Sequence, residues 1–543
     1  MISAHSGAQI REAERPLLDS GMGAVLMSRA SYGLASAIVS ELRSRGERLY
    51  GCSVTVLAGK GNNGGDGLFA AALLARRGMR TTAVLTAAVA HAEALGAFER
   101  AGGRVLRLAE NNMSEAVHAA CSAVVLIDAV LGTGAIGGLR GSAAELVHRI
   151  SEGRWTGEQR LTRVRPGLVV ACDLPSGVDA DTGQLHSPVL GADLTVTFGA
   201  AKIGLLCDPG AGAAGHVETV KIGIEQGLPT AELRRLETAD LAALLPAPSR
   251  RAHKYSRGVL GIVAGSAEYP GAGVLACQAA LAAGAGMIRY LGPPEVGALV
   301  QQSCPEVVLG HPDVAQNHVQ AWLVGPGVSG DEQLDRCAAA LETDVPVVVD
   351  AAALPKLPKD LTPNVVLTPH AGELAAIFTH RGLEISREQV EAGTFEAAQH
   401  AAGLFGATVL LKGAATVIAT PAGSNFSQSE GTSWLGTAGS GDVLAGILGA
   451  LLAQLGHNNE QVLEDFAGHG IEASDTWAAI ASMAASLHGR AGRIAAGVGV
   501  GRSRNSSAGP GRVELHGGAP LHATDIVKAV PEAWRDILNE STL

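Results

Sequence analysis

Aromatic residues are scarce in this chain: Phe, Trp and Tyr make up only 3% of its 543 residues. Glycine is abundant instead, with 71 residues, and hydrophobic residues of all kinds reach 47%. Small aliphatic side chains let helices pack closely on a sheet, whereas a β-sandwich relies on a bulkier core. The composition therefore favours an α/β architecture.

The chain also lacks long runs of Lys and Arg, and its formal net charge is −11. Sequence-independent binding of nucleic acid needs a basic surface, so that class of function is disfavoured and a small diffusible substrate is favoured. The seven cysteines form no C-x-x-C pair, which is typical of buried thiols in a reducing compartment. Charged side chains interrupt the first thirty residues, and no apolar run reaches the length of a membrane span. We therefore expect a soluble cytoplasmic protein without a membrane partner.

A length of 543 residues suits two domains, each with its own core. Short β-branched runs alternate with helical periodicity in both halves, which predicts parallel sheets covered by helices, with a Rossmann-like three-layer fold in the first half. Predicted strands lie at 53–58, 82–85, 123–127, 168–172, 194–198, 321–324, 345–349, 365–367, 408–411 and 416–419, and the run at 258–266 is predicted to be a strand that leads into a small-residue turn.

Prolines near residues 244–251 predict a linker. We expect an N-terminal domain at 1–235, a linker at 236–252 and a C-terminal domain at 253–543. The segments 152–165 and 489–518 lack apolar periodicity and are predicted to be loops.

The turn at 436–442 reads GTAGSGD and runs directly into an apolar segment with helical spacing. Glycines let backbone N–H groups converge on an anion, and a helix N-terminus adds about half a positive charge. Asp442 can accept a proton from a substrate hydroxyl, while the amides of Ser440 and Gly441 stabilise charge on a transferring phosphoryl group. This turn therefore predicts phosphoryl-transfer chemistry.

A different glycine loop, GKGNNGGDG at 59–67, follows the first predicted strand. The motif DAVLGTG begins at Asp128 and the motif DLPSGVD begins at Asp173, each at the end of another predicted strand. The carboxyl ends of parallel strands lie at one edge of a sheet, so these three loops are expected to meet. They predict a second nucleotide-handling site.

These three motifs, in this order, resemble the NAD(P)H-hydrate epimerase domain over roughly residues 1–225. The resemblance implies potassium ligands at Asn63, Asp128 and Ser176, whose oxygen donors suit a hard cation. It makes Asp173 the acid or base that interconverts the two C6 epimers of the hydrated nicotinamide ring. It implies that the hydrate binds to Asn62, Asn63, Gly64, Gly65, Asp66, Gly132, Thr133, Gly134, Ala135, Ile136, Gly137, Gly138 and Asp173.

The residues alone leave alternatives open in this half. Asp128 could be a turn or helix cap, and Asp66 could merely cap the helix that follows its loop. Lys202 could be an ordinary solvated lysine or a positive charge beside the site.

The second half contains KYSRG at 254–258, YPGA at 269–272, GPG at 325–327, TPHAGE at 368–373, KG at 412–413 and GSGD at 439–442. This series resembles the ADP-dependent NAD(P)H-hydrate dehydratase, a ribokinase-like α/β protein, over residues 250–540. The resemblance implies that the hydrate lies against Ala272, Gly327, His370 and Asp442. It places the adenine nucleotide, with magnesium, on Lys412, Gly413, Ala414, Ala415, Thr416 and Gly441.

Alternatives remain here too. His370 could be a structural histidine, Lys412 a surface lysine, and Glu373 either a magnesium ligand or a helix cap. Where the family has the pattern DADAL, this chain has DAAAL at 350–354, so Ala352 cannot supply the second carboxylate.

The leading hypothesis is a bifunctional repair enzyme. Its first domain would epimerise the R and S hydrates NADHX and NADPHX, and its second would dehydrate the S form with ADP, releasing AMP and phosphate. One alternative is a ribokinase-like small-molecule kinase with a regulatory nucleotide-binding domain, and another makes the first domain a non-catalytic binding module. A homo-oligomer is expected.

Overall fold

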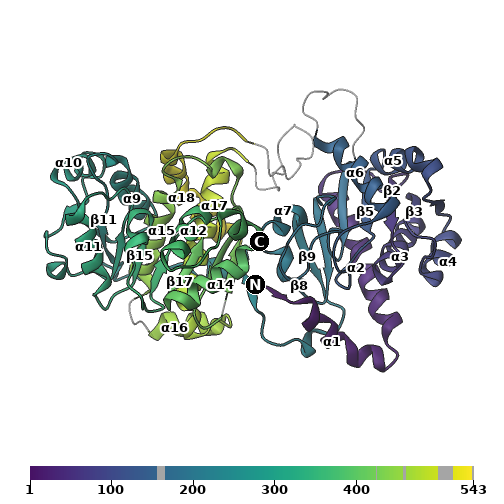
Figure 1. Ribbon diagram of the computed structural model, residues 1–543, viewed down its shortest axis with the longest axis horizontal. Helices are drawn as coiled ribbons and strands as arrows, with labels where there is room; N and C mark the ends of the chain where they lie inside the picture. The colour runs from purple at the N-terminus through teal and green to yellow at the C-terminus, as the bar shows by residue number, and fades with distance from the viewer. Residues whose placement is uncertain (156–165, 424, 457–459, 499–517, 541–543) are drawn as a thin grey trace. The chain divides into compact units, whose positions relative to one another are not determined.

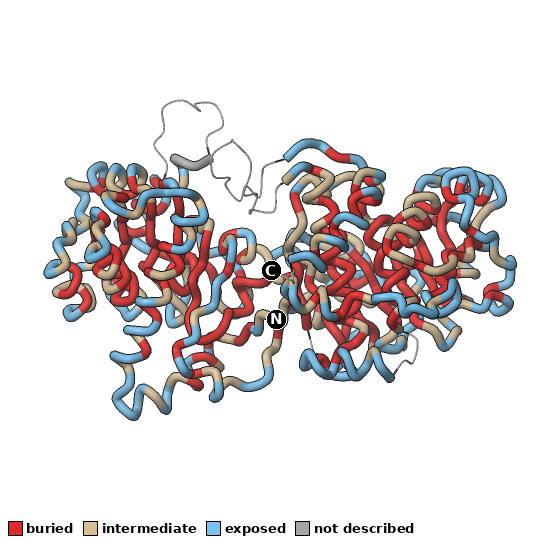
Figure 2. Tube along the Cα trace, turned by 180° about the vertical axis from the view of Figure 1, so that it is seen from behind, coloured by how far each residue is buried: buried red, intermediate tan, exposed pale blue. Residues whose placement is uncertain are grey.

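The computed structural model describes residues 1–155, 166–423, 425–456, 460–498 and 518–540 (Figure 1). The chain forms two compact units: the N-terminal unit comprises Ser3–Glu232, and the C-terminal unit begins at Leu233 and includes Met1–Ile2. Buried residues follow the central strands of each unit, and exposed residues lie mainly on the outer helices and loops (Figure 2). No helix within the described ranges is long and apolar enough to cross a membrane.

The N-terminal unit is built on a seven-stranded sheet in the order β4-β3-β2-β5-β6-β7-β9, and every neighbouring pair is parallel. Its strands are β2 (Ser53–Ala58), β3 (Arg80–Leu85), β4 (Arg104–Arg107), β5 (Val125–Ala129), β6 (Leu168–Cys172), β7 (Leu194–Phe198) and β9 (His216–Val220). A short strand, β1 (Ile2–His5), pairs in parallel with β8 (Ala201–Lys202). The expected α/β class is confirmed for this unit.

Helices cover both faces of this sheet: β5, β6 and β7 are buried throughout, and β5 and β6 contribute apolar side chains to the cores on both faces. One apolar cluster joins the sheet to α2, α3 and α4, and a second joins its other face to α5 and α6. The helices are α1 (Gly7–Asp19), α2 (Gly23–Ser44), α3 (Asn62–Arg76), α4 (Ala92–Arg100), α5 (Met113–Cys121), α6 (Gly141–Trp155) and α7 (Gly210–Ala214), with 3₁₀ turns at Glu110–Asn112, Ile203–Leu205 and Glu225–Gly227.

The C-terminal unit has a mixed sheet in the order β13-β12-β11-β14-β15-β16-β17-β18-β19-β10. Its strands from β13 to β17 are parallel, whereas β17, β18 and β19 form an antiparallel meander. The strands are β10 (Leu233–Arg235), β11 (Val259–Val263), β12 (Met287–Leu291), β13 (Val308–Leu309), β14 (Ala321–Val324), β15 (Val347–Val349), β16 (Val365–Leu367), β17 (Thr408–Leu411), β18 (Thr416–Ala419) and β19 (Asn425–Gln428).

One apolar core joins this sheet to α9, α15, α17 and α18. The fit of α9 against α15 is tight, because a Cβ on Gly446 would lie 2.5 Å from the carbonyl oxygen of Ala276. The helices are α8 (Thr238–Leu244), α9 (Pro270–Ala282), α10 (Pro294–Ser303), α11 (Asp331–Leu341), α12 (Ala371–His380), α13 (Arg387–Ala392), α14 (Thr394–Phe405), α15 (Ser440–Leu455), α16 (Glu460–Gly468), α17 (Thr476–Ala495) and α18 (Ala523–Glu540), with 3₁₀ turns at Val314–Gln316, Ala351–Lys356, Ser433–Leu435 and Ala473–Asp475.

Three predicted irregular segments differ from expectation. Within the expected linker 236–252, helix α8 buries Leu241 and Leu244 in the core of the C-terminal unit. The predicted loop at 152–165 begins inside α6, and its residues 156–165 lie outside the described residues. The predicted loop at 489–518 is wrong at its start, which belongs to α17, whereas residues 499–517 lie outside the described residues.

The glycines at the start of that segment allow close packing within a helix. A Cβ on Gly489 would lie 2.8 Å from the backbone nitrogen of Gly431, and a Cβ on Gly492 would lie 2.4 Å from the side chain of Leu435. Glycine content alone therefore misidentified a buried helix as a loop.

Candidate active sites

The first candidate site lies at the carboxyl ends of β2, β5 and β6, where the sequence predicted that three loops meet. A Cβ on Gly59 would lie 2.1 Å from the carbonyl oxygen of Val130, and a Cβ on Gly64 would lie 2.1 Å from the carbonyl oxygen of Gly59. The loops after β2 and β5 can approach this closely only because side chains are missing there. Asn62 begins α3, so Asn62, Asn63, Gly64 and Gly65 form its first turn.

Asn63, Asp128 and Ser176 are held together around the backbone of Leu131. The Asn63 Nδ2 donates to the Leu131 carbonyl oxygen over 2.8 Å, and the Leu131 N–H donates to the Ser176 Oγ over 2.9 Å. The carboxylate of Asp128 accepts the Ser176 hydroxyl over 2.6 Å and the Ser176 N–H over 2.8 Å. The Asn63 Oδ1 is buried and has no hydrogen-bond partner.

Asp128 is fully buried, and burial raises its pKa above the ordinary value, although the N–H and O–H donors of Ser176 and Val130 oppose that shift. The buried carboxylate and the unpartnered amide oxygen of Asn63 give the site a cluster of hard oxygen donors.

Asp173 follows β6 and is the centre of a second network. Its backbone adopts a left-handed conformation, with φ of 69°, which is costly for a residue with a side chain and is found mostly where function demands it. Its Oδ2 accepts the Thr133 N–H over 3.0 Å and the Thr133 hydroxyl over 2.6 Å, and its Oδ1 accepts the Thr197 hydroxyl over 3.2 Å. The Lys202 Nζ donates to the same Oδ1.

Lys202 is a buried charge partner of Asp173, so the interpretation as a solvated lysine is wrong. Its side chain is 1% exposed, and its Nζ also donates to the Thr197 hydroxyl over 2.8 Å and to the Phe198 carbonyl oxygen over 3.2 Å. Burial acts to raise the pKa of Asp173, but the charge of Lys202 and the hydrogen bonds from Lys202 and Thr133 outweigh it, so this pKa is lowered overall.

Asp66 has the opposite electrostatic character. It does not cap α3, whose N-cap is Gly61, and it accepts a long hydrogen bond of 3.5 Å from the Ser31 hydroxyl. Burial raises the pKa of Asp66 well above its ordinary value, and the negative charge of Asp173 raises it further. The pKa of Glu14 on α1 is raised as well, mainly by burial.

The remaining loop residues predicted to bind the hydrate differ in how closely they approach the site. A Cβ on Gly132 would lie 3.0 Å from the Asn63 side chain, so the second loop directly touches the first. Ile136 is 97% exposed and belongs to no apolar core. Gly134, Ala135 and Gly137 continue this loop, and Gly138 lies against the backbone of His186. Sequence reasoning missed Thr197, whose signal was a hydroxyl within a fully buried strand.

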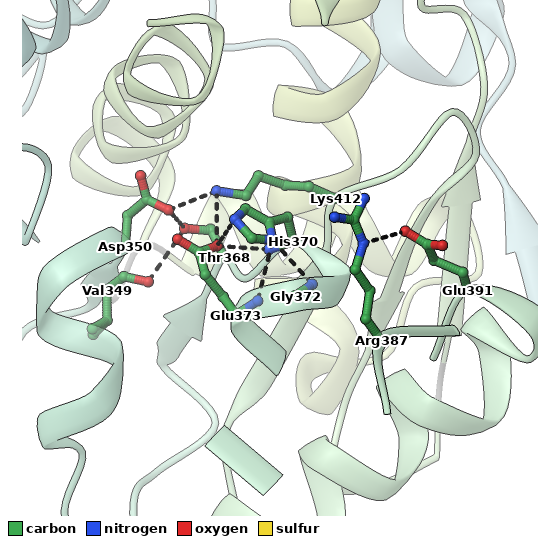
Figure 3. A network of polar contacts seen from close by, with 9 residues as sticks. All are labelled: Val349, Asp350, Thr368, His370, Gly372, Glu373, Arg387, Glu391 and Lys412. Atoms are coloured by element: carbon green, nitrogen blue, oxygen red, sulfur yellow. Dashed lines mark hydrogen bonds and ion pairs between the residues drawn. The ribbon is translucent and has the colours of Figure 1, made fainter. Parts of the chain in front are cut away.

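The second candidate site lies at the carboxyl ends of β15, β16 and β17, and Figure 3 shows its polar network. The Lys412 Nζ donates to the Asp350 Oδ1 over 2.9 Å and lies 3.7 Å from the Glu373 Oε2. The Thr368 hydroxyl donates to the same Asp350 oxygen over 2.8 Å. The Lys412 side chain is only 20% exposed, so the interpretation as a surface lysine is wrong.

His370 and Glu373 form a reciprocal cap at the start of α12. The Nδ1 of His370 accepts the N–H groups of Gly372 and Glu373 over 3.0 and 3.1 Å, and the Glu373 Oε2 accepts the His370 N–H over 2.8 Å (Figure 3). Both residues therefore have the structural role that was the alternative to ligand binding. The His370 side chain is still 58% exposed, so the capped ring remains accessible to a ligand.

The turn at 436–442 leads into α15 as predicted. Gly439 is its N-cap, adopts a left-handed conformation with φ of 85° and provides no side-chain cap. A Cβ on Gly441 would lie 3.6 Å from the Lys412 Nζ, which joins this turn to the Lys412 network. The Ser440 N–H donates to the Thr437 carbonyl oxygen over 3.3 Å, so this amide, which the sequence suggested as a phosphate donor, already has a partner.

Asp442 lies in the first turn of α15. Burial and, to a smaller extent, the charge of Asp350 raise its pKa to about 6, against the opposing charge of Lys412. A carboxylate with this pKa is mostly ionised at neutral pH and is well matched to accept and return a proton.

Ala272 and Gly327 are neighbours, because a Cβ on Gly327 would lie 2.6 Å from the Cβ of Ala272. Ala272 is in the first turn of α9, and Leu275 of that helix packs on the turn, where a Cβ on Gly439 would lie 2.6 Å from its Cδ1. Residues 412–415 connect β17 to β18, and the hydroxyl of Thr416, the first residue of β18, donates to the Gly413 carbonyl oxygen over 3.2 Å. Ala414 is exposed and Ala415 is buried in that connection.

One residue near this site was missed by sequence reasoning. His488 on α17 is buried, and its Nε2 shares a hydrogen bond of 3.2 Å with the hydroxyl of Ser440. The available signal was an isolated histidine in an otherwise small and apolar helical segment.

Comparison with known proteins covers both halves of the chain. A family model described as NAD(P)H-hydrate dehydratase matches residues 260–496, and one described as YjeF-related protein N-terminus matches residues 23–204. A protein of Mycobacterium leprae named bifunctional NAD(P)H-hydrate repair enzyme Nnr is 42% identical over 83% of this chain and 89% of its own length. A protein of the same name from Corynebacterium glutamicum is 32% identical over 89% of each chain.

Among solved structures, the ADP/ATP-dependent NAD(P)H-hydrate dehydratase of Bacillus subtilis, co-crystallised with ATP and Mg²⁺, is 25% identical to this chain. The match covers 56% of this chain and 98% of that one, with a TM-score of 0.45.

Proposed function

Because this chain belongs to the family of bifunctional NAD(P)H-hydrate repair enzymes, we propose that it restores hydrated nicotinamide nucleotides to NADH and NADPH. The N-terminal unit epimerises the R and S hydrates, and the C-terminal unit dehydrates the S form with ADP. The observation that carries this proposal is that each unit has a carboxylate beside a lysine that is buried or partly buried near the carboxyl ends of its strands. These are Asp173 with Lys202, and Asp442 beside Lys412.

In the C-terminal unit, Asp442 accepts the proton of the C6 hydroxyl as that oxygen attacks the β-phosphorus of ADP. The new P–O bond forms as the bond to the α-phosphate oxygen breaks, and AMP leaves. Lys412 and the Gly441 amide, which lie beside Asp442, stabilise the negative charge on the transferring oxygens. The phosphorylated oxygen then leaves C6 as phosphate, and loss of a proton from the neighbouring ring carbon gives the dihydronicotinamide.

In the N-terminal unit, epimerisation requires that the C6 hydroxyl leave and return on the other face of the ring. Asp173 is kept ionised by Lys202 and its hydroxyl donors, so it is the base that takes a proton from the returning water. The ring nitrogen supplies the electron pair that expels the hydroxyl. The expelled hydroxide takes up one proton and leaves as water, and the returning water gives one proton to Asp173, so atoms and charge balance over the cycle.

The N-terminal oxygen cluster fits potassium. The Asn63 Oδ1 is buried without a partner, and the Asp128 carboxylate lies in the same network. Asn63, Asp128 and Ser176 would hold the ion, which would supply positive charge for the phosphates of the bound nucleotide.

The C-terminal unit fits a magnesium ion that arrives with the nucleotide. Within the described residues, no group of three or more His, Cys, Asp or Glu side chains is arranged to hold a metal, and Asp350 and Glu373 already face Lys412. Magnesium is commonly bound through phosphates with only one or two carboxylates. The ion would neutralise phosphate charge, while Lys412 keeps the two carboxylates in place.

Product analysis tests the proposed function. Incubation with the S hydrate, ADP and magnesium should yield AMP, phosphate and NADH in equal amounts, as measured by ³¹P NMR and chromatography. A stable phosphorylated product formed preferentially with ATP would instead support the small-molecule kinase. The predicted homo-oligomer and cytoplasmic location stay predictions.

A further inference from the structure

His488 is a buried, titratable side chain that the mechanism above does not use. It lies on α17, is 8% exposed, and its Nε2 is 3.2 Å from the Ser440 Oγ. Buried polar groups are costly unless they are hydrogen-bonded, so this contact is more than incidental.

The partner of His488 occupies a sensitive position. Ser440 is the first residue of α15, two residues before Asp442. The N-cap, Gly439, has no side chain with which to hold the helix start, and Gly436 and Gly441 flank the same turn. Glycines give this backbone more conformational freedom than other residues would, so a side-chain contact from outside the turn adds to the backbone hydrogen bond between Ser440 and Thr437. Ser440 is the first helical residue with a side chain that can make such a contact.

The helix that carries His488 is a rigid support. The Ser486 hydroxyl donates to the Glu430 Oε1 over 2.8 Å, and Gly489 packs against the backbone of Gly431. Residues 478–489 of α17 are buried without interruption. The hydrogen bond to Ser440 therefore links the glycine-rich turn to a helix that is buried in the core.

The electrostatics also suit a positioning role. Burial, with a smaller contribution from the charge of Lys412, lowers the pKa of His488 to about 4, although a hydrogen bond with the Ser440 backbone opposes the shift. The imidazole is therefore neutral at physiological pH and can keep one hydrogen bond in one tautomer. It adds no charge that would compete with Lys412 for the nucleotide.

We propose that His488 is a positioning residue for dehydration: through its hydrogen bond to Ser440 it fixes the start of α15, so that Asp442 and the Gly441 amide face the nucleotide in productive geometry. This proposal rests on the proposed dehydratase function. His488 touches no substrate and acts only through Ser440.

The test compares four variants: His488→Leu, His488→Gln, Ser440→Ala and the double variant His488→Leu/Ser440→Ala. Misplacement of a catalytic group by about 1 Å can cost on the order of 100-fold in rate, so His488→Leu should lower the kcat of dehydration by about 10- to 100-fold. Glutamine can place an amide nitrogen near the position of the Nε2, so His488→Gln should recover most of that loss. The kcat of the double variant should be no lower than that of the more impaired single variant.

Three controls separate positioning from mere stability. Epimerisation, catalysed in the other unit, should stay at the wild-type rate in every variant. The proposal would be overturned if His488→Gln lowered the kcat of dehydration as much as His488→Leu does. It would also be overturned if the losses in kcat of His488→Leu and Ser440→Ala multiplied in the double variant. If His488→Leu is poorly folded, the comparison of His488→Gln with Ser440→Ala still decides, because only the second removes the link.

Binding of ADP, measured by calorimetry, distinguishes this proposal from the proposed function. A wild-type protein that binds ADP but forms no NADH from the S hydrate contradicts the dehydratase function. An active wild type, with His488→Leu unchanged in both kcat and the Kd for ADP, contradicts the role of His488 alone.

Discussion

Replacing Lys202 with methionine should remove the charge that keeps Asp173 ionised. Lys202 is 1% exposed and Asp173 is 12% exposed, and their ion pair is supported by Thr133 and Thr197. Removing one partner of a buried ion pair typically costs about 3–5 kcal/mol, because the other charge remains buried and uncompensated. For a unit of this size, that corresponds to a fall in melting temperature on the order of 10 °C.

The loss of stability in Lys202→Met should depend on pH. The pKa of Asp173 is lowered in the folded wild type, so Asp173 stabilises the fold above its unfolded pKa, and this contribution is lost as the pH falls through the folded value. In Lys202→Met, burial is no longer opposed by the lysine charge, so the pKa of Asp173 should rise. The variant should then be destabilised most at neutral pH, and the difference from wild type should shrink on acidification.

The assay is thermal unfolding from pH 5 to 8, together with the rates of epimerisation and dehydration. Epimerisation at neutral pH should fall by on the order of 100-fold, since a protonated Asp173 no longer acts as a general base and loss of such a base typically costs about 10²- to 10⁴-fold. Dehydration should be unchanged in folded protein. Lys221→Met, at an exposed lysine of the same unit, is the matched control and should leave both rates intact. A stability loss in Lys202→Met that does not vary with pH, or an unchanged rate of epimerisation, would refute the reasoning.

Three further predictions concern other parts of the two sites. Asp442→Asn should lower the rate of dehydration about 10²- to 10⁴-fold and leave epimerisation intact. In the wild type, kcat/KM for dehydration should rise with pH through about 6, where Asp442 ionises. A flat profile from pH 5 to 7 would contradict this. Asn63→Leu removes the unpartnered buried oxygen, so any stimulation of epimerisation by potassium over lithium should disappear, and stimulation that persists would remove Asn63 from the ion site. Gly327→Ala places a Cβ 2.6 Å from the Cβ of Ala272 at a left-handed backbone position, so it should lower the melting temperature and raise the KM for the hydrate. The control is Gly330→Ala, where the backbone is also left-handed but the new Cβ meets open space; it should leave that KM unchanged.

Most of the buried strands were predictable because they are short β-branched runs whose residues have no exposed face, but β19, which is buried throughout and reads NFSQ, was missed. The strands β6 and β7 begin and end at the predicted residues. In contrast, β4 and β9 were missed, since both contain charged or polar exposed residues among their apolar ones, and this pattern is typical of loops. The position of the site loops followed from the rule that parallel strands end at one edge.

Side-chain burial near the sites was much harder to predict. Lys202 is buried because Asp173, Thr197 and a backbone carbonyl converge on its amine, and that convergence depends on tertiary geometry. His488 pairs with a residue 48 positions away in sequence, so its role has no local signature. The prolines at 244–251 mark the end of α8, and the helix before them was therefore mistaken for part of a linker.

The central claim is that two independent sites act in series on one damaged nucleotide. The most direct measurement is the dihydronicotinamide absorbance recovered from a mixture of R and S NADHX with ADP, magnesium and potassium, for the wild type and for Asp173→Asn. The account predicts that the wild type recovers the whole mixture, whereas the variant stops once the S form is consumed. A variant that also recovers the whole mixture, with no contribution from spontaneous epimerisation, would contradict the assignment of Asp173, and a wild type that recovers nothing would contradict the account as a whole.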